Sequence, residues 1–181
     1  MSSELQNLIN FDSDFSESKF KSKVENEFAK IKLSMVTGKT ERIEHFVSDE
    51  VYSKIVAKVQ NDIDNGRIQM YDELNVADVR IVDIEELEDR FKITVTVHSK
   101  IMEYFIDRNT IKFLSGNNSS RIERDSTLVF EKIKNNKALG AARRCPYCAA
   151  TLDINNNGVC NFCGSTFPLE NYDWVITYMD I

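Results

Sequence analysis

The four cysteines of the sequence form two C-x-x-C pairs near the C-terminus, Cys145/Cys148 and Cys160/Cys163, separated by 11 residues. Each C-x-x-C turn directs two sulfur atoms toward one point, and two such turns complete a tetrahedron of thiolates. Four thiolate ligands leave no coordination position open for water. We therefore predict a zinc ribbon that holds one structural zinc ion per chain, with all four cysteines as its ligands.

Three other uses of these cysteines are open at this stage. Two disulfides would require an oxidising compartment, but residues 1–15 contain no basic region, long apolar run or cleavage site of a signal peptide. A thioredoxin-like redox centre uses a single C-x-x-C in a βαβ unit, and iron–sulfur clusters usually have other spacings. Gly164 follows the second pair, where a tight knuckle needs a positive φ. The spacing favours zinc over these alternatives.

The composition is that of a globular protein with one main domain and a small module, since 42% of its 181 residues are hydrophobic. The formal net charge of −6 excludes the overall positive field that drives nonspecific binding to nucleic acids. No apolar run approaches the roughly 18–20 residues that cross a bilayer. Together with reduced cysteines, these features predict a cytoplasmic location.

Helical periodicity dominates the first third of the chain. A long helix is expected to begin after Ser16 or Ser18 and to end before Gly38. A short helix is expected around residues 43–47, and Ser48 is a suitable N-cap for a third helix. The apolar face of the long helix comprises Phe20, Val24, Phe28, Ile31 and Met35, and that of the third comprises Val51, Tyr52, Ile55, Val56, Val59 and Ile63.

From Val76 the apolar period changes to two, which is typical of strands with one buried face. Helices followed by strands with short turns predict an α+β fold, in which N-terminal helices pack on a curved, mainly antiparallel, cone-like sheet. Because strand patterns precede and follow the cysteines, we expect the zinc ribbon to be inserted in the last hairpin. Strands are expected at residues 79–82, 91–98, 101–106, 111–114, 127–133 and 172–179.

The sequence divides into three expected parts: an N-terminal segment (1–15), the cone-like domain (16–137 plus 170–181) and the zinc ribbon (138–169). Leu5, Leu8 and Ile9 give the N-terminal segment an apolar face with helical spacing. Its charged residues are acidic, unlike those of a helix on a membrane surface. We expect the segment to fold over the domain as a lid or to mediate dimerisation.

Several motifs resemble bacterial relatives of the mitochondrial import-motor membrane anchor, the Tim44-like domain proteins. The resemblance covers about residues 12–133 plus 172–181. The motifs that carry it are Asp14-Phe15-Ser16 leading to Phe20, the segment FVSDEVY (46–52), the strand VTVHSKIMEYFIDRNT (95–110), LVFEK (128–132) beside the W-T-F-x-R strand of the family, and Trp174. In this chain Leu128 stands for the Trp of that strand, Lys132 for its Arg, and Ser13 for the usual Pro of the entry motif.

The resemblance implies a cone fold like that of nuclear transport factor two and a noncatalytic module linked to protein transport or to membrane peripheries. Some bacterial members carry a zinc ribbon near the C-terminus. The implied partners are a protein segment or a hydrophobic ligand held in an apolar cone, with peripheral membrane contact and self-association left open. The family supplies no catalytic residue to this chain.

No catalytic constellation is evident in the sequence. His98 alternates with the apolar positions 91–97 and is expected to face solvent, as is His45 beside Glu44. Glu85, Glu86, Glu88 and Asp89 form a solvated turn between strands rather than a general-acid pair. Phosphate-binding, dinucleotide, serine-hydrolase and zinc-protease motifs are missing. We therefore expect that the protein is not an enzyme.

The alternative function is nucleic-acid binding through the ribbon. Residues 132–144 hold five basic residues and no acidic one, and aromatic residues on the knuckles could stack on bases. The rest of the chain is acidic and would repel phosphate. A noncatalytic zinc-binding adaptor is therefore the main prediction, and a nucleic-acid-binding ribbon is the alternative. The residues concerned are Lys132, Lys134, Lys137, Arg143, Arg144, Tyr147 and Phe162.

Overall fold

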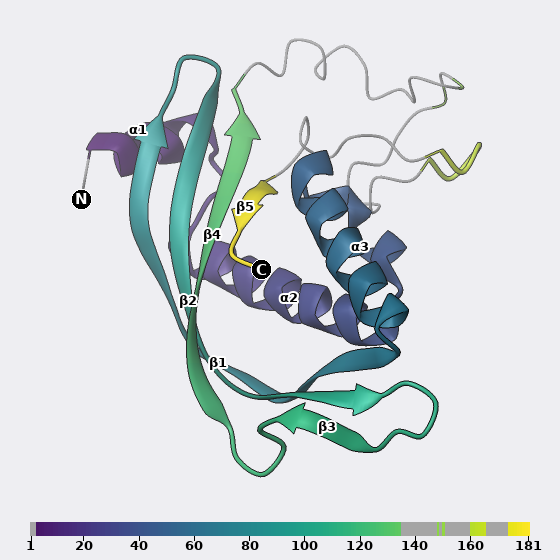
Figure 1. Ribbon diagram of the computed structural model, residues 1–181. Coiled ribbons are helices and arrows are strands. Elements are labelled where there is room, and N and C mark those ends of the chain that lie inside the picture. Colours follow the sequence, from purple (N-terminus) through teal and green to yellow (C-terminus); the bar gives the residue numbers. More distant parts are fainter. Residues whose placement is uncertain (1–2, 135–147, 149, 151–159, 166–173) are drawn as a thin grey trace.

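The computed structural model describes residues 3–134, 148, 150, 160–165 and 174–181 (Figure 1). Helices come first and strands follow, as the α+β prediction required. The helical part consists of α1 (Ser3–Phe11), α2 (Glu17–Thr37), two short 3₁₀ turns (Thr40–Arg42 and Glu44–Phe46) and α3 (Asp49–Asp64). The strands are β1 (Arg67–Glu86), β2 (Arg90–Asp107), β3 (Phe113–Gly116), β4 (Ile122–Ile133) and β5 (Val175–Met179).

Serine caps begin both long helices, as their sequences predicted. The Ser16 hydroxyl accepts a hydrogen bond from the Lys19 N–H at 3.3 Å, and Ser48 accepts one from the Val51 N–H at 3.3 Å. Each bond satisfies one of the N–H groups that the first turn of a helix leaves unpaired. Gly38 ends α2 in the left-handed conformation, with φ of 71°.

The strands form one antiparallel sheet in the order β1-β2-β4-β5, and β3 pairs with the far end of β2. A single parallel bridge joins Val47 to Ile176. Figure 1 shows α2 and α3 lying against the same side of the curved sheet. The predicted fold class, helices packed on a curved and mainly antiparallel sheet, is confirmed.

Several predicted strand boundaries were wrong, including the start of β4, which is Ile122 rather than Thr127. β1 begins at Arg67 rather than after Val76, because register shifts at 72/75, 76/78 and 81/83 interrupt its period-two pattern. The expected strands 91–98 and 101–106 are one strand, β2, which pairs with neighbours along both edges. β3 begins at Phe113 because Ile111, with φ of 60°, belongs to the preceding turn.

One apolar core joins the helices to the sheet. The predicted face of α2 is buried along its whole length, from Phe20 to Met35. Phe20 packs edge-on against Phe130 of β4 and against Trp174, with ring centroids 5.2 and 5.4 Å apart. The predicted face of α3 is only partly correct, because Val56 is 37% exposed. The four positions expected to be buried on β2, Phe91, Ile93, Val95 and Val97, are buried, and so are Ser99, Ile101 and Ile106.

The N-terminal segment packs into this core. Leu8 of α1 is completely buried, and the Phe11 ring lies 5.3 Å from that of Phe91. Phe15 contacts both Phe20 and Trp174. Residues 3–15 therefore fold over the domain and contribute apolar surface to it.

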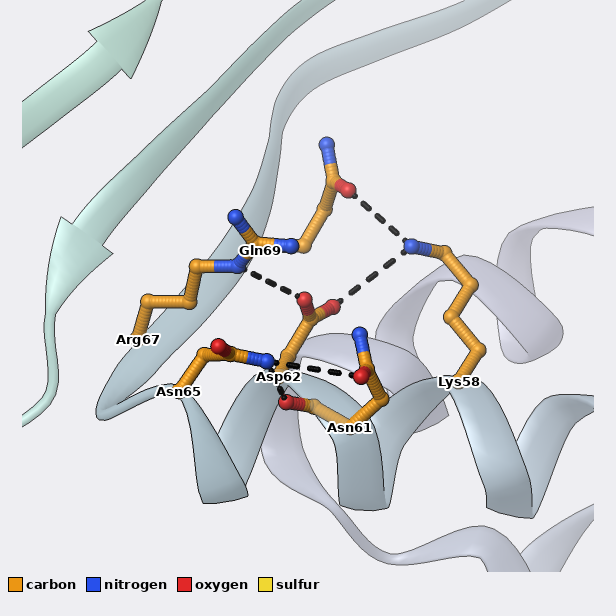
Figure 2. Close-up of polar contacts among 6 residues, drawn as sticks. All are labelled: Lys58, Asn61, Asp62, Asn65, Arg67 and Gln69. Carbon is orange, nitrogen blue, oxygen red and sulfur yellow. Dashed lines mark hydrogen bonds and ion pairs between the residues drawn. The ribbon is translucent and has the colours of Figure 1, made fainter.

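A buried ion pair fixes the connection from α3 to β1 (Figure 2). Asp62, at the end of α3, is 6% exposed and accepts a hydrogen bond from Arg67 Nε at 2.9 Å. The Lys58 ammonium lies 3.5 Å from Asp62 and 3.1 Å from the Gln69 side-chain oxygen. The buried carboxylate is thus matched by two cations, as its removal from water requires.

Candidate functional site

The predicted zinc ligands lie between two strands that pair with each other. β4 and β5 are antiparallel neighbours, with Leu128 opposite Met179 and Glu131 opposite Val175. The segment that contains the cysteines connects them. The cysteines therefore lie, along the chain, between the two strands of the last hairpin, and the ribbon itself remains a prediction.

Three of the four cysteine sulfur atoms converge. The Sγ atoms of Cys148, Cys160 and Cys163 lie within 4.8 Å of one another, and those of Cys148 and Cys160 are 3.6 Å apart. Two thiolates on one tetrahedral zinc, each about 2.3 Å from the ion, would be about 3.8 Å apart. Cys148, Cys160 and Cys163 form no disulfide with one another. The fourth predicted ligand, Cys145, lies outside the described residues.

The second C-x-x-C turn has the backbone of a metal knuckle. The Gly164 N–H donates to the Cys160 carbonyl at 2.8 Å, and the Cys160 N–H donates to the Ser165 carbonyl at 2.9 Å. Gly164 has the positive φ that the sequence predicted, 71°. The backbone N–H groups of Cys163 and Phe162 donate to the Cys160 sulfur and lower the pKa of this thiol. The turn thus favours a thiolate at Cys160, the form that binds metal ions.

A second candidate site is a cavity of about 310 Å³ between α2, α3 and the sheet. The apolar cone interior expected from the family resemblance is not what surrounds it, because most of the lining side chains are polar or charged. They are Lys32, Lys58, Gln69, Tyr71, Ser99, Glu103, Arg124, Asp125, Ser126 and Asp180, with Phe28, Ile101 and Ile181 as the apolar members.

The polar lining arises because the inward face of the sheet changes character along its strands. On β2 the period of two continues from Val97 through the buried Ser99 and Ile101 to the half-buried Glu103. The inner face of β4 becomes polar at the same point along the sheet, where Ser126 lies opposite Val97 in the antiparallel register. The alternating strand predicted from the sequence ended at residue 98, so the prediction did not include these inward-facing positions. Extending the period of two to residue 103 would have placed Ser99 and Glu103 on the inner face.

Lys32 is the cation most enclosed by this cavity wall. Its ammonium lies 4.4 Å from the centre of the Tyr71 ring and 5.3 Å from that of Phe28. Burial lowers the pKa of Lys32, and the nearby Glu103 carboxylate only partly offsets this effect. Burial also raises the pKa of the Tyr71 hydroxyl, which therefore remains protonated and able to donate a hydrogen bond.

The residues considered for catalysis have ordinary structural partners. His98 faces away from the core and its Nδ1 lies 2.7 Å from Asp125 Oδ1, in agreement with a surface role. The side chain of His45 lies outside the described part of the chain. Three acidic residues at the turn between β1 and β2 each form an ion pair with a different cation. Glu85 contacts Lys92 at 2.8 Å, Glu86 contacts Lys134 at 2.7 Å, and Asp89 contacts Arg90 at 2.8 Å.

Two residues of the basic stretch 132–144 are also paired with acids. Lys132 lies 2.6 Å from Asp12, and Lys134 lies 2.7 Å from Glu86. These ammonium groups are therefore less available to nucleic-acid phosphates than the sequence suggested. The other three basic residues, Lys137, Arg143 and Arg144, lie outside the described residues.

None of the described helices has the length and apolar character needed to cross a membrane. The model of one protein family, the Tim44-like domain, matches residues 1–140 of the sequence. The match extends from α1 through α2 and α3 to the end of β4, and it ends before the four cysteines. No curated protein is significantly similar to the chain.

Proposed function

Because the chain belongs to the Tim44-like domain family, we propose that it is a noncatalytic, zinc-stabilised adaptor that binds a protein segment and serves protein transport. The observation that carries this proposal is an exposed apolar cluster at the β2–β3 turn. Ile111, Phe113 and Leu114 are 63%, 47% and 50% exposed. Neighbouring exposed apolar side chains of this kind often mark a surface that contacts another protein.

Strand β3 offers a polypeptide more than apolar contact. It pairs with β2 through Tyr104–Ile106, and its other edge has no partner among the described strands. A partner segment in extended conformation can add to such an edge through main-chain hydrogen bonds, with the apolar side chains supplying specificity. The cavity inside the cone is polar, so a protein segment fits the described surface better than an apolar ligand does.

The metal of this adaptor is zinc, held by Cys145 together with the three converging cysteines. Thiolates are soft ligands that favour zinc, and a complete set of four gives a closed structural site. The ion would stabilise the ribbon, which is too small to bury a core of its own. We propose that the protein acts in the cytoplasm, and that any contact with a membrane is peripheral and made through its partner.

The proposed function is tested by photocrosslinking in the native host, with a photoreactive residue placed at position 112. The expected result is a crosslinked polypeptide that is lost in a Phe113→Ser/Leu114→Ser variant. Leu33→Ser is the matched control, because Leu33 is 56% exposed on α2 and is not part of β3. This control should retain the crosslink.

Three results would contradict the adaptor proposal. They are a crosslink to RNA in place of a polypeptide, equal crosslinking in the double variant and the control, and turnover of a substrate by the purified protein. The first would favour the alternative of a nucleic-acid-binding ribbon. Light scattering of the purified protein identifies a second copy of the chain if that copy is the partner.

A further inference from the structure

The polar side chains that line the cavity differ in whether the protein itself supplies their hydrogen-bond partners. Its acidic side chains already have donors within the protein. Glu103 accepts from Arg124 Nε at 3.2 Å, Asp125 lies 2.7 Å from His98, and Asp180 accepts from the Thr127 N–H at 3.0 Å. The acidic part of the lining therefore needs no further cation.

Two of the three cations in the lining are also occupied. Arg124 is the partner of Glu103, and Lys58 lies between the Asp62 carboxylate and the Gln69 side-chain oxygen (Figure 2). Lys32 differs from both. It contacts the rings of Tyr71 and Phe28, but within the described chain it makes no hydrogen bond and no ion pair.

Two hydroxyl groups of the lining join Lys32 as available donors. Neither the Tyr71 hydroxyl nor that of Ser126 has a hydrogen-bond partner in the part of the chain that the structure describes. Ser126 is only 9% exposed, so the protein around it withholds most contact with bulk water. A polar group in such a position usually has a partner, either in the protein or in a bound molecule.

We propose that this cavity binds a small organic monocarboxylate, whose carboxylate contacts Lys32 together with the hydroxyls of Tyr71 and Ser126. One carboxylate supplies acceptors for all three groups. Phe28 and Ile101, the apolar members of the inner wall, would contact the carbon chain of the ligand. The volume of about 310 Å³ is at the lower end of the range for small-molecule sites, which suits a ligand of few carbons.

The charges of the lining favour one negative charge on the ligand over two. Lys32, Lys58 and Arg124 line the cavity with only two carboxylates, Glu103 and Asp180, because the Asp125 carboxylate pairs with His98 on the other face of the sheet. A monocarboxylate brings a single negative charge and meets the ammonium of Lys32. A phosphate dianion would bring a second negative charge close to Glu103 and Asp180, which repel it.

The test is a titration of the full-length protein with sodium butyrate at constant ionic strength, followed by amide chemical shifts in NMR spectra. We expect saturable shifts at residues that line the cavity. Lys32→Met keeps the apolar stem and removes the charge, so it should weaken binding at least about tenfold. Lys30→Met is the matched control, because Lys30 is an exposed lysine on the same helix that does not line the cavity. Its affinity should be unchanged.

Tyr71→Phe is a second variant, useful if Lys32→Met fails to fold, and should weaken butyrate binding several-fold without changing any charge. The proposal is overturned if butyrate gives no saturable shift, or if Lys32→Met binds as well as Lys30→Met. Tighter binding of inorganic phosphate than of butyrate at the same residues would also overturn it. The metal ribbon and β3 take no part in this titration, so its outcome is independent of the proposed adaptor function.

Discussion

The Lys132 ammonium lies 2.6 Å from Asp12 Oδ2 and joins the end of β4 to the turn that follows α1. Both side chains are largely enclosed, at 18% and 14% exposure. Lys132 occupies the position at which the resemblance places an Arg of the family, and Asp12 directly precedes Ser13 of the entry motif. The pair therefore attaches the N-terminal segment to the strand that leads into the ribbon.

Replacing Lys132 by Met should destabilise the protein by about 1–3 kcal/mol, because the Asp12 carboxylate would remain enclosed without its charged partner. Urea unfolding measures this loss, and hydrogen exchange should show faster exchange in α1. Lys100→Met is the matched control, since Lys100 forms an exposed pair with Glu123 at 2.9 Å. Exposed pairs contribute only about 0–1 kcal/mol. Equal effects of the two variants would contradict the structural role of Lys132.

Leu8→Ala should cost about 2–5 kcal/mol of the free energy of unfolding, because Leu8 is completely buried in the core. Leu33→Ala is its control on an exposed surface and should change stability by less than about 0.5 kcal/mol. Both values come from denaturant unfolding. If Leu8→Ala were as mild as Leu33→Ala, α1 would not be part of the core. A deletion of residues 1–15 would remove Leu8, Phe11 and Phe15 together, so it would damage the domain rather than only expose it.

The helices and the central strands could be predicted because their local signals agree with their packing. Ser16 and Ser48 are strong caps, and the alternation of β2 from Phe91 to Val97 matches the face that is buried. β1 could not be predicted beyond its centre. Its register shifts and the positive φ of Glu73 arise where it pairs with β2, and they erase the period of two in the sequence.

The two candidate sites also differ in how far they could be predicted from the sequence. The cysteine site could be predicted because its ligands are close in sequence and their spacing is itself a signal. The cavity around Lys32 could not, because its walls come from two helices and three strands. Its enclosure depends on α2 crossing the sheet, which no local pattern encodes. The extended alternation of β2 would have located only one wall.

The turn after β2 should make stability depend on pH. The Asp107 carboxylate accepts hydrogen bonds from the Thr110 N–H at 2.7 Å, the Thr110 hydroxyl at 2.9 Å and the Asn109 N–H at 3.0 Å, and these lower its pKa. A lowered folded-state pKa contributes stability that is complete above the ordinary value of 3.8 and is lost as the pH falls through the folded-state pKa. Asp107→Asn should therefore be less stable than the natural protein near pH 6, and the difference should close in acid. Urea unfolding across this pH range checks the prediction, and a constant difference would contradict it.

Cys160→Ser should abolish most of the metal binding. Its sulfur lies within 4.8 Å of those of Cys148 and Cys163, and a hydroxyl is a much weaker zinc ligand than a thiolate. Elemental analysis should find about one zinc per natural chain and far less in the variant.

The sheet should keep its thermal transition, because Cys160 is not part of the core that joins α2 to β2 and β4. Phe162→Ser introduces the same residue between the two cysteines of the knuckle, at a side chain that is 75% exposed, and should retain the zinc. Equal metal content in both variants, or two disulfides in protein alkylated at lysis, would contradict a thiolate site. If chelation unfolded the sheet together with the ribbon, the metal would stabilise the whole domain instead of one hairpin.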